Sequence, residues 1–337
     1  MVGSFSKLCG WQEDTQGIRS YARRVGTLRS VARSLLGGPQ EDVHLWQAIL
    51  ACKPTWRRAS QGIGDCVSWG AELCATSLMA TDAVLGQGTW TEEAATESIY
   101  GGARVEALNK SRGGKSDGAF GYAAARWLCE YGVLLRIDYS KETKNPEHNL
   151  RKYSATRSKD WGDFGCGGKD DKGILDKLAK AHPIQNVAQV TQVAEAIASL
   201  SNHYPISIAS MAGYGDMVRD SQGVCRRSGQ WAHQMAILGM RFENSKPQFR
   251  VFQSWGDSCS GPDPQIQQLV EAVPRWKRPK NVKASWNPIS ACSWWITEAD
   301  LAWILKTGDC WSYAGVRGFE PRKLDSKKAI LERLPRS

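Results

Sequence analysis

The order in which helical and strand-like segments follow one another constrains this chain most. Residues 66–85 and 121–131 have the apolar spacing and the end signals of helices, and a further helix is expected near 190–201. Short apolar runs typical of strands then follow at 205–209, 235–240, 249–253, 294–296 and 311–313. Such segregation of helices and strands predicts an α+β fold with two lobes.

On this basis the chain divides into four parts. They are a basic N-terminal extension at 1–50 with an amphipathic helix over 17–36, a helical lobe at 51–185, a strand-rich lobe at 186–313 with an insertion at 258–292, and a basic tail at 314–337. Within the helical lobe, the polar stretch 141–180 is expected to be a surface excursion.

Charge favours an acidic partner without showing one. The 337 residues include 44 Lys and Arg against 34 Asp and Glu, a net charge of +10, and such an excess favours polyanions. The helix at 17–36 either docks on the main body or on a second subunit, or it contacts nucleic acid or a membrane surface. The basic loop 275–283 is either a solvated loop or a polyanion patch.

Other patterns exclude whole classes of protein. No apolar run approaches the roughly 18 residues of a membrane span. The first residues lack the pattern of a secretory signal, which favours a cytoplasmic or virion-associated location. None of the ten cysteines forms a Cys-x-x-Cys pair, so a zinc ribbon is not expected. Reduced thiols are the default, and no metal or cofactor is implied.

The segment around Cys66 carries a chemical signal. Cys66 falls in the first turn of a helix, with Asp65 as its expected N-cap. The amides at a helix start stabilise a thiolate, which is the nucleophilic form. Gln61 can supply an amide donor to an oxyanion, together with the Cys66 backbone N–H.

Two later segments can complete such a site. His233 precedes an apolar strand and can accept the thiol proton to form an ion pair. Gln253 ends the next strand, in Gln253-Ser254-Trp255-Gly256, where an amide can fix the orientation of an imidazole.

These segments, in this order, resemble the papain-like cysteine peptidases. That family has a Gln, a Cys at a helix start, a His before a hydrophobic strand and then Asn-Ser-Trp-Gly. The resemblance extends over about residues 55–313, and a narrower one links the chain to papain-like proteins of tailed phages and bacterial genomes. It implies a helical lobe with Cys66 and a strand-rich, barrel-like lobe with His233 and Gln253. It also implies that Gly118 and Trp255 lie at the substrate.

Several residues depart from the family pattern. Gln61 stands five residues before Cys66 instead of six, and Gln253 replaces the family's Asn. The family's Gly-Gly pair aligns near Gly118-Ala119, so one glycine is missing. His233 follows Cys66 by 167 residues, beyond the roughly 130–150 usual for this family. The first 50 residues are short for an inhibitory propeptide, and whether they block the site is left open.

Two functions follow from the resemblance. The first is a thiol hydrolase that cleaves peptide or isopeptide bonds of a peptide or protein substrate. In it Cys66 attacks, His233 moves the proton, Gln253 orients His233 and Gln61 holds the oxyanion. The alternative is an inactive papain-like scaffold, a structural or interaction protein such as a phage virion component, that uses its basic extensions to bind a polyanion or to assemble with other copies.

Overall fold

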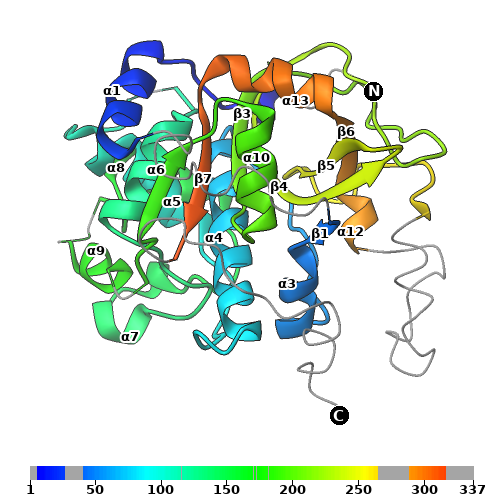
Figure 1. Ribbon diagram of the computed structural model, residues 1–337. Coiled ribbons are helices and arrows are strands. Elements are labelled where there is room, and N and C mark those ends of the chain that lie inside the picture. Colours follow the sequence, from blue (N-terminus) through cyan, green and yellow to red (C-terminus); the bar gives the residue numbers. More distant parts are fainter. Residues whose placement is uncertain are drawn as a thin grey trace.

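The helices of the first half of the chain gather on one side of an antiparallel sheet. The computed structural model describes residues 6–26, 41–114, 116–169, 171, 173–180, 182–264 and 288–315. In Figure 1, helix α4 runs through the middle of the molecule, with α5 to α9 on one side and strands β4 to β6 on the other. The predicted α+β fold with segregated helices and strands is therefore confirmed.

The helices of the first half include the two that the sequence predicted at 66–85 and 121–131, with small shifts at their ends, and several that it did not predict. They are α1 (Thr15–Val25), α3 (Trp46–Cys52), α4 (Cys66–Val84), α5 (Thr96–Arg104), α6 (Gly121–Glu130), α7 (Ser140–Thr143), α8 (Ala155–Phe164) and α9 (Ile174–Ala179), with short 3-10 turns at Ser6–Leu8, Glu106–Leu108 and Pro146–His148. The second half adds α10 (Val193–Ser201), α12 (Pro288–Ala291), α13 (Glu298–Ile304) and a 3-10 turn at Leu305–Thr307.

The strands of the described residues pair antiparallel in the order β2-β7-β3-β4-β5-β6, and the short β1 pairs with β4. The expected barrel-like closure is wrong, because the sheet is open between β2 and β6. Strand β2 lies beside α1 and α6 instead of beside β6. The strands are β1 (Val43–His44), β2 (Asn186–Gln189), β3 (Ile206–Ala212), β4 (Gln230–Glu243), β5 (Lys246–Phe252), β6 (Ser293–Thr297) and β7 (Cys310–Ala314).

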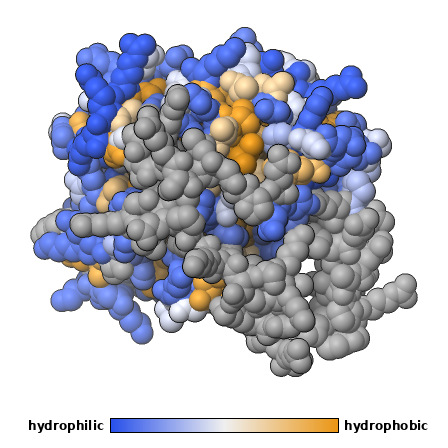
Figure 2. Space-filling view, in the orientation of Figure 1, coloured by the Kyte–Doolittle hydropathy of each residue, from blue (hydrophilic) through white to orange (hydrophobic). Residues whose placement is uncertain are grey.

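Helix α1 docks on the body of its own chain. Its apolar residues Ile18 and Tyr21 are buried, and Arg24 forms an ion pair with Glu130 at the end of α6. Figure 2 shows the upper left of this face, where α1 lies in Figure 1, mostly in the blue of hydrophilic residues. The helix ends at Val25, earlier than predicted, and residues 27–40 lie outside the described part.

The segment 141–180 is not the surface excursion that its polarity suggested. Helix α8 packs along α5, and Trp161 on it is almost fully buried. Leu150 and His148 are buried as well. The polar residues of this stretch misled the prediction, because several of them bond to buried carboxylates: Arg157 pairs with Glu97, and Ser158 donates to Asp65.

Helix α4 is the core element of the fold. Fifteen of its nineteen residues are buried, as expected for a helix that is apolar on every side. The described part of the chain contains no helix long and apolar enough to cross a membrane.

A buried ion pair ties α4 to the end of β5. The Arg58 guanidinium donates to Glu72 Oε2 at 2.5 Å, to Trp69 O at 2.7 Å and to Gln253 O at 3.3 Å. The side chains of Arg58 and Glu72 are each 4% exposed. A buried pair of this kind is costly to break, because the remaining charge loses its partner inside the protein.

We therefore predict that Arg58→Met lowers the free energy of unfolding by about 3–5 kcal/mol. The neighbouring Arg57 is the matched control, since its 60% exposed side chain pairs with Asp257 near the surface. Arg57→Met should cost no more than about 1 kcal/mol. Chemical denaturation of both variants checks this. Equal losses would show that the Arg58 pair does not hold α4 to β5.

Candidate functional site

Cys66 is the first residue of α4, as the sequence predicted, and its thiol is buried. The Gly10 N–H donates to Cys66 Sγ at 3.3 Å, and the Gln234 N–H on β4 donates to the same atom. Burial raises the pKa of the thiol to about 12. The thiol is therefore protonated at neutral pH in this state of the protein.

Asp65 does not cap the helix with its side chain, in contrast to the prediction. Its carboxylate instead accepts hydrogen bonds from Trp69 Nε1 at 3.1 Å, from Tyr153 OH at 3.0 Å and from Ser158 Oγ at 2.7 Å. Burial raises the pKa of Asp65 to about 7. The like-charge repulsion expected between Asp65 and a Cys66 thiolate is therefore reduced.

His233 lies on β4, one residue before Gln234. The Gln234 side chain donates to Val67 O on α4 at 3.1 Å, so the strand and the start of the helix meet at the residues that follow His233 and Cys66. Among the described residues neither nitrogen of the His233 ring has a hydrogen-bond partner. Burial, together with the nearby Arg58 charge, lowers the pKa of His233 to about 3. The imidazole is neutral here, and no ion pair with Cys66 is formed.

Gln253 is turned away from His233. Its Nε2 donates to Gly256 O at 3.0 Å and to Ser258 Oγ at 2.6 Å, and its Oε1 accepts the Trp255 N–H. Gln253 thus fixes the turn that follows β5. The ring that contacts His233 is that of Trp255, with a centroid separation of 4.4 Å.

The side-chain amide of Gln61 is fully engaged in hydrogen bonds. Its Nε2 donates to Leu8 O at 2.7 Å and to Ile63 O at 2.8 Å, and its Oε1 accepts from Ser254 Oγ. Gln61 Nε2, which the sequence analysis assigned to an oxyanion, therefore already donates to a backbone carbonyl near the N-terminus, that of Leu8.

Residues 8–12, which we call the N-terminal strap, cross the site as an extended peptide. The Trp11 N–H donates to Ala232 O at 3.0 Å, the Gln12 N–H donates to Ala119 O at 2.9 Å, and Gly10 O accepts from the Ala119 N–H at 2.8 Å. With Leu8 O on Gln61 and the Gly10 N–H on Cys66, the strap is held by main-chain hydrogen bonds throughout. The N-terminal strap thus lies against the Cys66 thiol.

The strap pairs with Ala119, and Gly118 makes room for it. Gly118 has a φ of +107°, and a Cβ there would lie 2.6 Å from Gly10 O. The loop before it is held by Arg104, which donates to the carbonyls of Gly113 and Ser116 at 2.9 and 2.7 Å. Sequence reasoning missed Arg104 and the strap, because neither carries a local motif.

Cys66 Sγ thus accepts from the strap and from the β4 backbone at the residue after His233, and Gln61 binds the strap as well. In the described part of the chain no cluster of His, Cys, Asp and Glu could hold a metal ion.

Comparison with known proteins defines the fold. No protein-family model matches this sequence, and no curated protein matches it. Among solved structures, xylellain, a cysteine protease from Xylella fastidiosa, superposes with a TM-score of 0.55 over 93% of this chain and 97% of its own, at 15% identity. Procathepsin L 3 of Tenebrio molitor larval midgut gives 0.48 over 91% of this chain and 83% of its own, at 13% identity. The chain therefore has the papain-like fold, and the expected resemblance is confirmed at that level.

The neutral His233 predicts a pH dependence of stability. Because its folded-state pKa lies below that of the unfolded chain, the unfolded state alone takes up this proton between about pH 6.5 and 3. The stabilising contribution is complete above pH 6.5 and is lost as the pH falls. Relative to His233→Gln, the wild type should lose on the order of 2 kcal/mol of unfolding free energy between pH 6.5 and 4.5. Denaturant titrations at both pH values measure this difference. A difference independent of pH would contradict a buried neutral imidazole.

Proposed function

We propose that this protein is a cysteine peptidase that its own N-terminal strap holds inactive. One observation carries the proposal: an extended peptide backbone is bound across Cys66 by hydrogen bonds to Gln61, Ala119 and Ala232. A site that binds a peptide main chain beside a thiol and an imidazole is suited to peptide hydrolysis.

The chemistry follows from these groups. With the strap gone, water reaches Cys66 and His233, and the burial that keeps both neutral is relieved. His233 takes the thiol proton, and Cys66 Sγ attacks the substrate carbonyl carbon. Gln61 Nε2 and the Cys66 N–H stabilise the oxyanion. His233 then gives its proton to the leaving amine, and water hydrolyses the acyl-enzyme. Gln253 contributes by positioning Trp255, which packs on His233.

The strap meets the thiol through an N–H group. The Gly10 N–H donates to Cys66 Sγ at 3.3 Å, so the thiol is engaged as a hydrogen-bond acceptor. The carbonyl that accepts from Gln61 belongs to Leu8, two residues away. Trp11 of the strap forms a parallel β-bridge with Ala119.

A single substitution should open the site. A Cβ at Gly10 would lie 1.7 Å from Gly64 O, so Gly10→Ala cannot keep the strap in place. We predict that Gly10→Ala increases the rate at which a thiol-directed epoxide modifies Cys66 by at least about tenfold, with the eight cysteines other than Cys66 and the strap's own Cys9 unchanged. Mass spectrometry of the labelled peptides measures it. The control is Gly88→Ala on an exposed turn, where a Cβ meets nothing closer than 3.5 Å.

Hydrolysis of a mixed peptide library then tests the activity itself. The Gly10→Ala variant should cleave it, and the same variant carrying Cys66→Ser should not. If Cys66 becomes reactive in Gly10→Ala and no peptide is cleaved, the inactive scaffold is the better description. The virion association and the polyanion contact remain hypotheses, since the basic loop 275–283 and residues 316–337 of the basic tail lie outside the described residues.

A further inference from the structure

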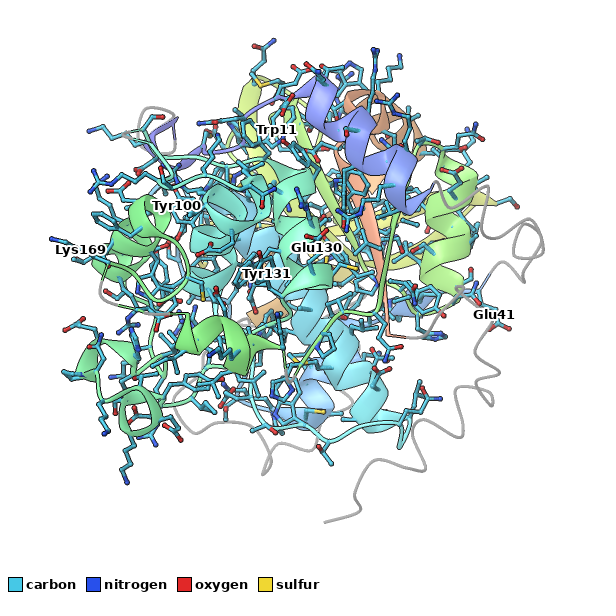
Figure 3. The ribbon with its side chains drawn as sticks, turned by 90° about the vertical axis from the view of Figure 1, so that its left-hand side faces the viewer. Trp11, Glu41, Tyr100, Glu130, Tyr131 and Lys169 are labelled. Atoms are coloured by element: carbon cyan, nitrogen blue, oxygen red, sulfur yellow. The ribbon has the colours of Figure 1, made fainter. Side chains whose placement is uncertain are left out.

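The strap carries a side chain that is buried at the site. Trp11 is 4% exposed, although Gln12 and Glu13 after it are partly or fully exposed. Its Nε1 donates to Asp309 Oδ2 at 2.7 Å. In Figure 3, Trp11 lies close to the start of α1, above Tyr100 of α5. The Trp11 backbone forms a β-bridge with Ala119. We call the space that the Trp11 indole fills the Trp11 site.

The floor of the Trp11 site is a buried carboxylate. Asp309 precedes β7 and is fully buried. It accepts from the Gly121 N–H at 2.9 Å and from Trp311 Nε1 at 2.7 Å. These donors are neutral, and within the described residues no ion pair includes Asp309. Burial raises its pKa. A buried carboxylate without a cation is strongly attractive to one.

A second acceptor lies close to Asp309. Gln234 is 1% exposed, and the bond from its Nε2 to Val67 O fixes the orientation of its amide. Its Oε1 has no partner among the described residues. A Cβ at Gly121 would lie 2.7 Å from both Asp309 Oδ2 and Gln234 Oε1. The two oxygens are therefore at most twice that distance apart, about 5.4 Å.

The Trp11 indole has one N–H, so it satisfies Asp309 and leaves Gln234 without a donor. A guanidinium carries five N–H donors in a planar fork and a full charge, which suits a carboxylate beside a second oxygen. Resting on the proposed function, we propose that the Trp11 site is the side-chain pocket of the substrate and selects a cationic residue, arginine above all, through Asp309 and Gln234.

The first test needs no catalysis. In the full chain, Trp11→Arg places a guanidinium in the pocket, and Trp11→Met is its uncharged control of similar length. We expect the unfolding temperature of Trp11→Arg to equal or exceed that of Trp11→Met. In an Asp309→Asn background the order should reverse, because the cation loses its carboxylate. If Asp309→Asn does not fold, Gln234→Met can replace it as the background. In that background the difference in unfolding temperature between Trp11→Arg and Trp11→Met should become smaller. An unfolding temperature of Trp11→Arg at least about 5 °C below that of Trp11→Met would overturn the proposal.

The second test uses catalysis in the opened Gly10→Ala chain. Three peptide substrates differ only at the residue that enters the pocket: arginine, its neutral isostere citrulline, and norleucine. We expect kcat/KM for arginine to exceed that for citrulline by about tenfold, with norleucine lowest. A preference for norleucine overturns the pocket assignment and leaves the peptidase standing. If Trp11→Arg is as stable as expected and the opened chain cleaves none of the substrates, the peptidase proposal is wrong, whereas the proposal of a pocket for a cationic side chain is retained.

Discussion

The close approach of α4 to β4 is the constraint on which the rest of the structure depends. A Cβ at Gly70 would lie 2.9 Å from Gln234 Cγ and 3.1 Å from Met235 O, so the helix and the strand touch through a glycine. That contact places the first residue of the helix, Cys66, beside the strand that carries His233. The Arg58–Glu72 pair then ties the same helix to the end of β5, where Trp255 contacts the imidazole. Cys66, His233 and Trp255 take their places because β4 and the end of β5 are both fixed to one buried helix.

Burial also sets the charge state of the site. Cys66 and His233 belong to two adjoining elements, α4 and β4, and both side chains are buried. Desolvation favours the neutral form of both, raising the pKa of Cys66 and lowering that of His233. Burial therefore disfavours the thiolate, which is the reactive form of a cysteine.

Sequence reasoning succeeded where the signal is local. The helix start at Cys66, the helix predicted at 121–131 and the strand predicted after His233 follow from apolar periodicity and from end signals. It failed where a residue's role depends on partners far along the chain. Gln253 was assigned to His233 from its position in a motif, but nearer groups of its own turn take its side chain. The strap, Arg58 and Asp309 act over separations of 14 to 298 residues, which no local pattern reveals.

The central claim is that residues 8–12 bind to the site as a peptide would. Hydrogen exchange of the full chain at neutral pH, resolved to single amides, tests it most directly. The N–H groups of Gly10, Trp11 and Gln12 donate to Cys66 Sγ, Ala232 O and Ala119 O. We predict that all three exchange at least about a hundredfold more slowly than in an unstructured peptide, because exchange requires the strap to open. Exchange of these amides at the unstructured rate would contradict the account.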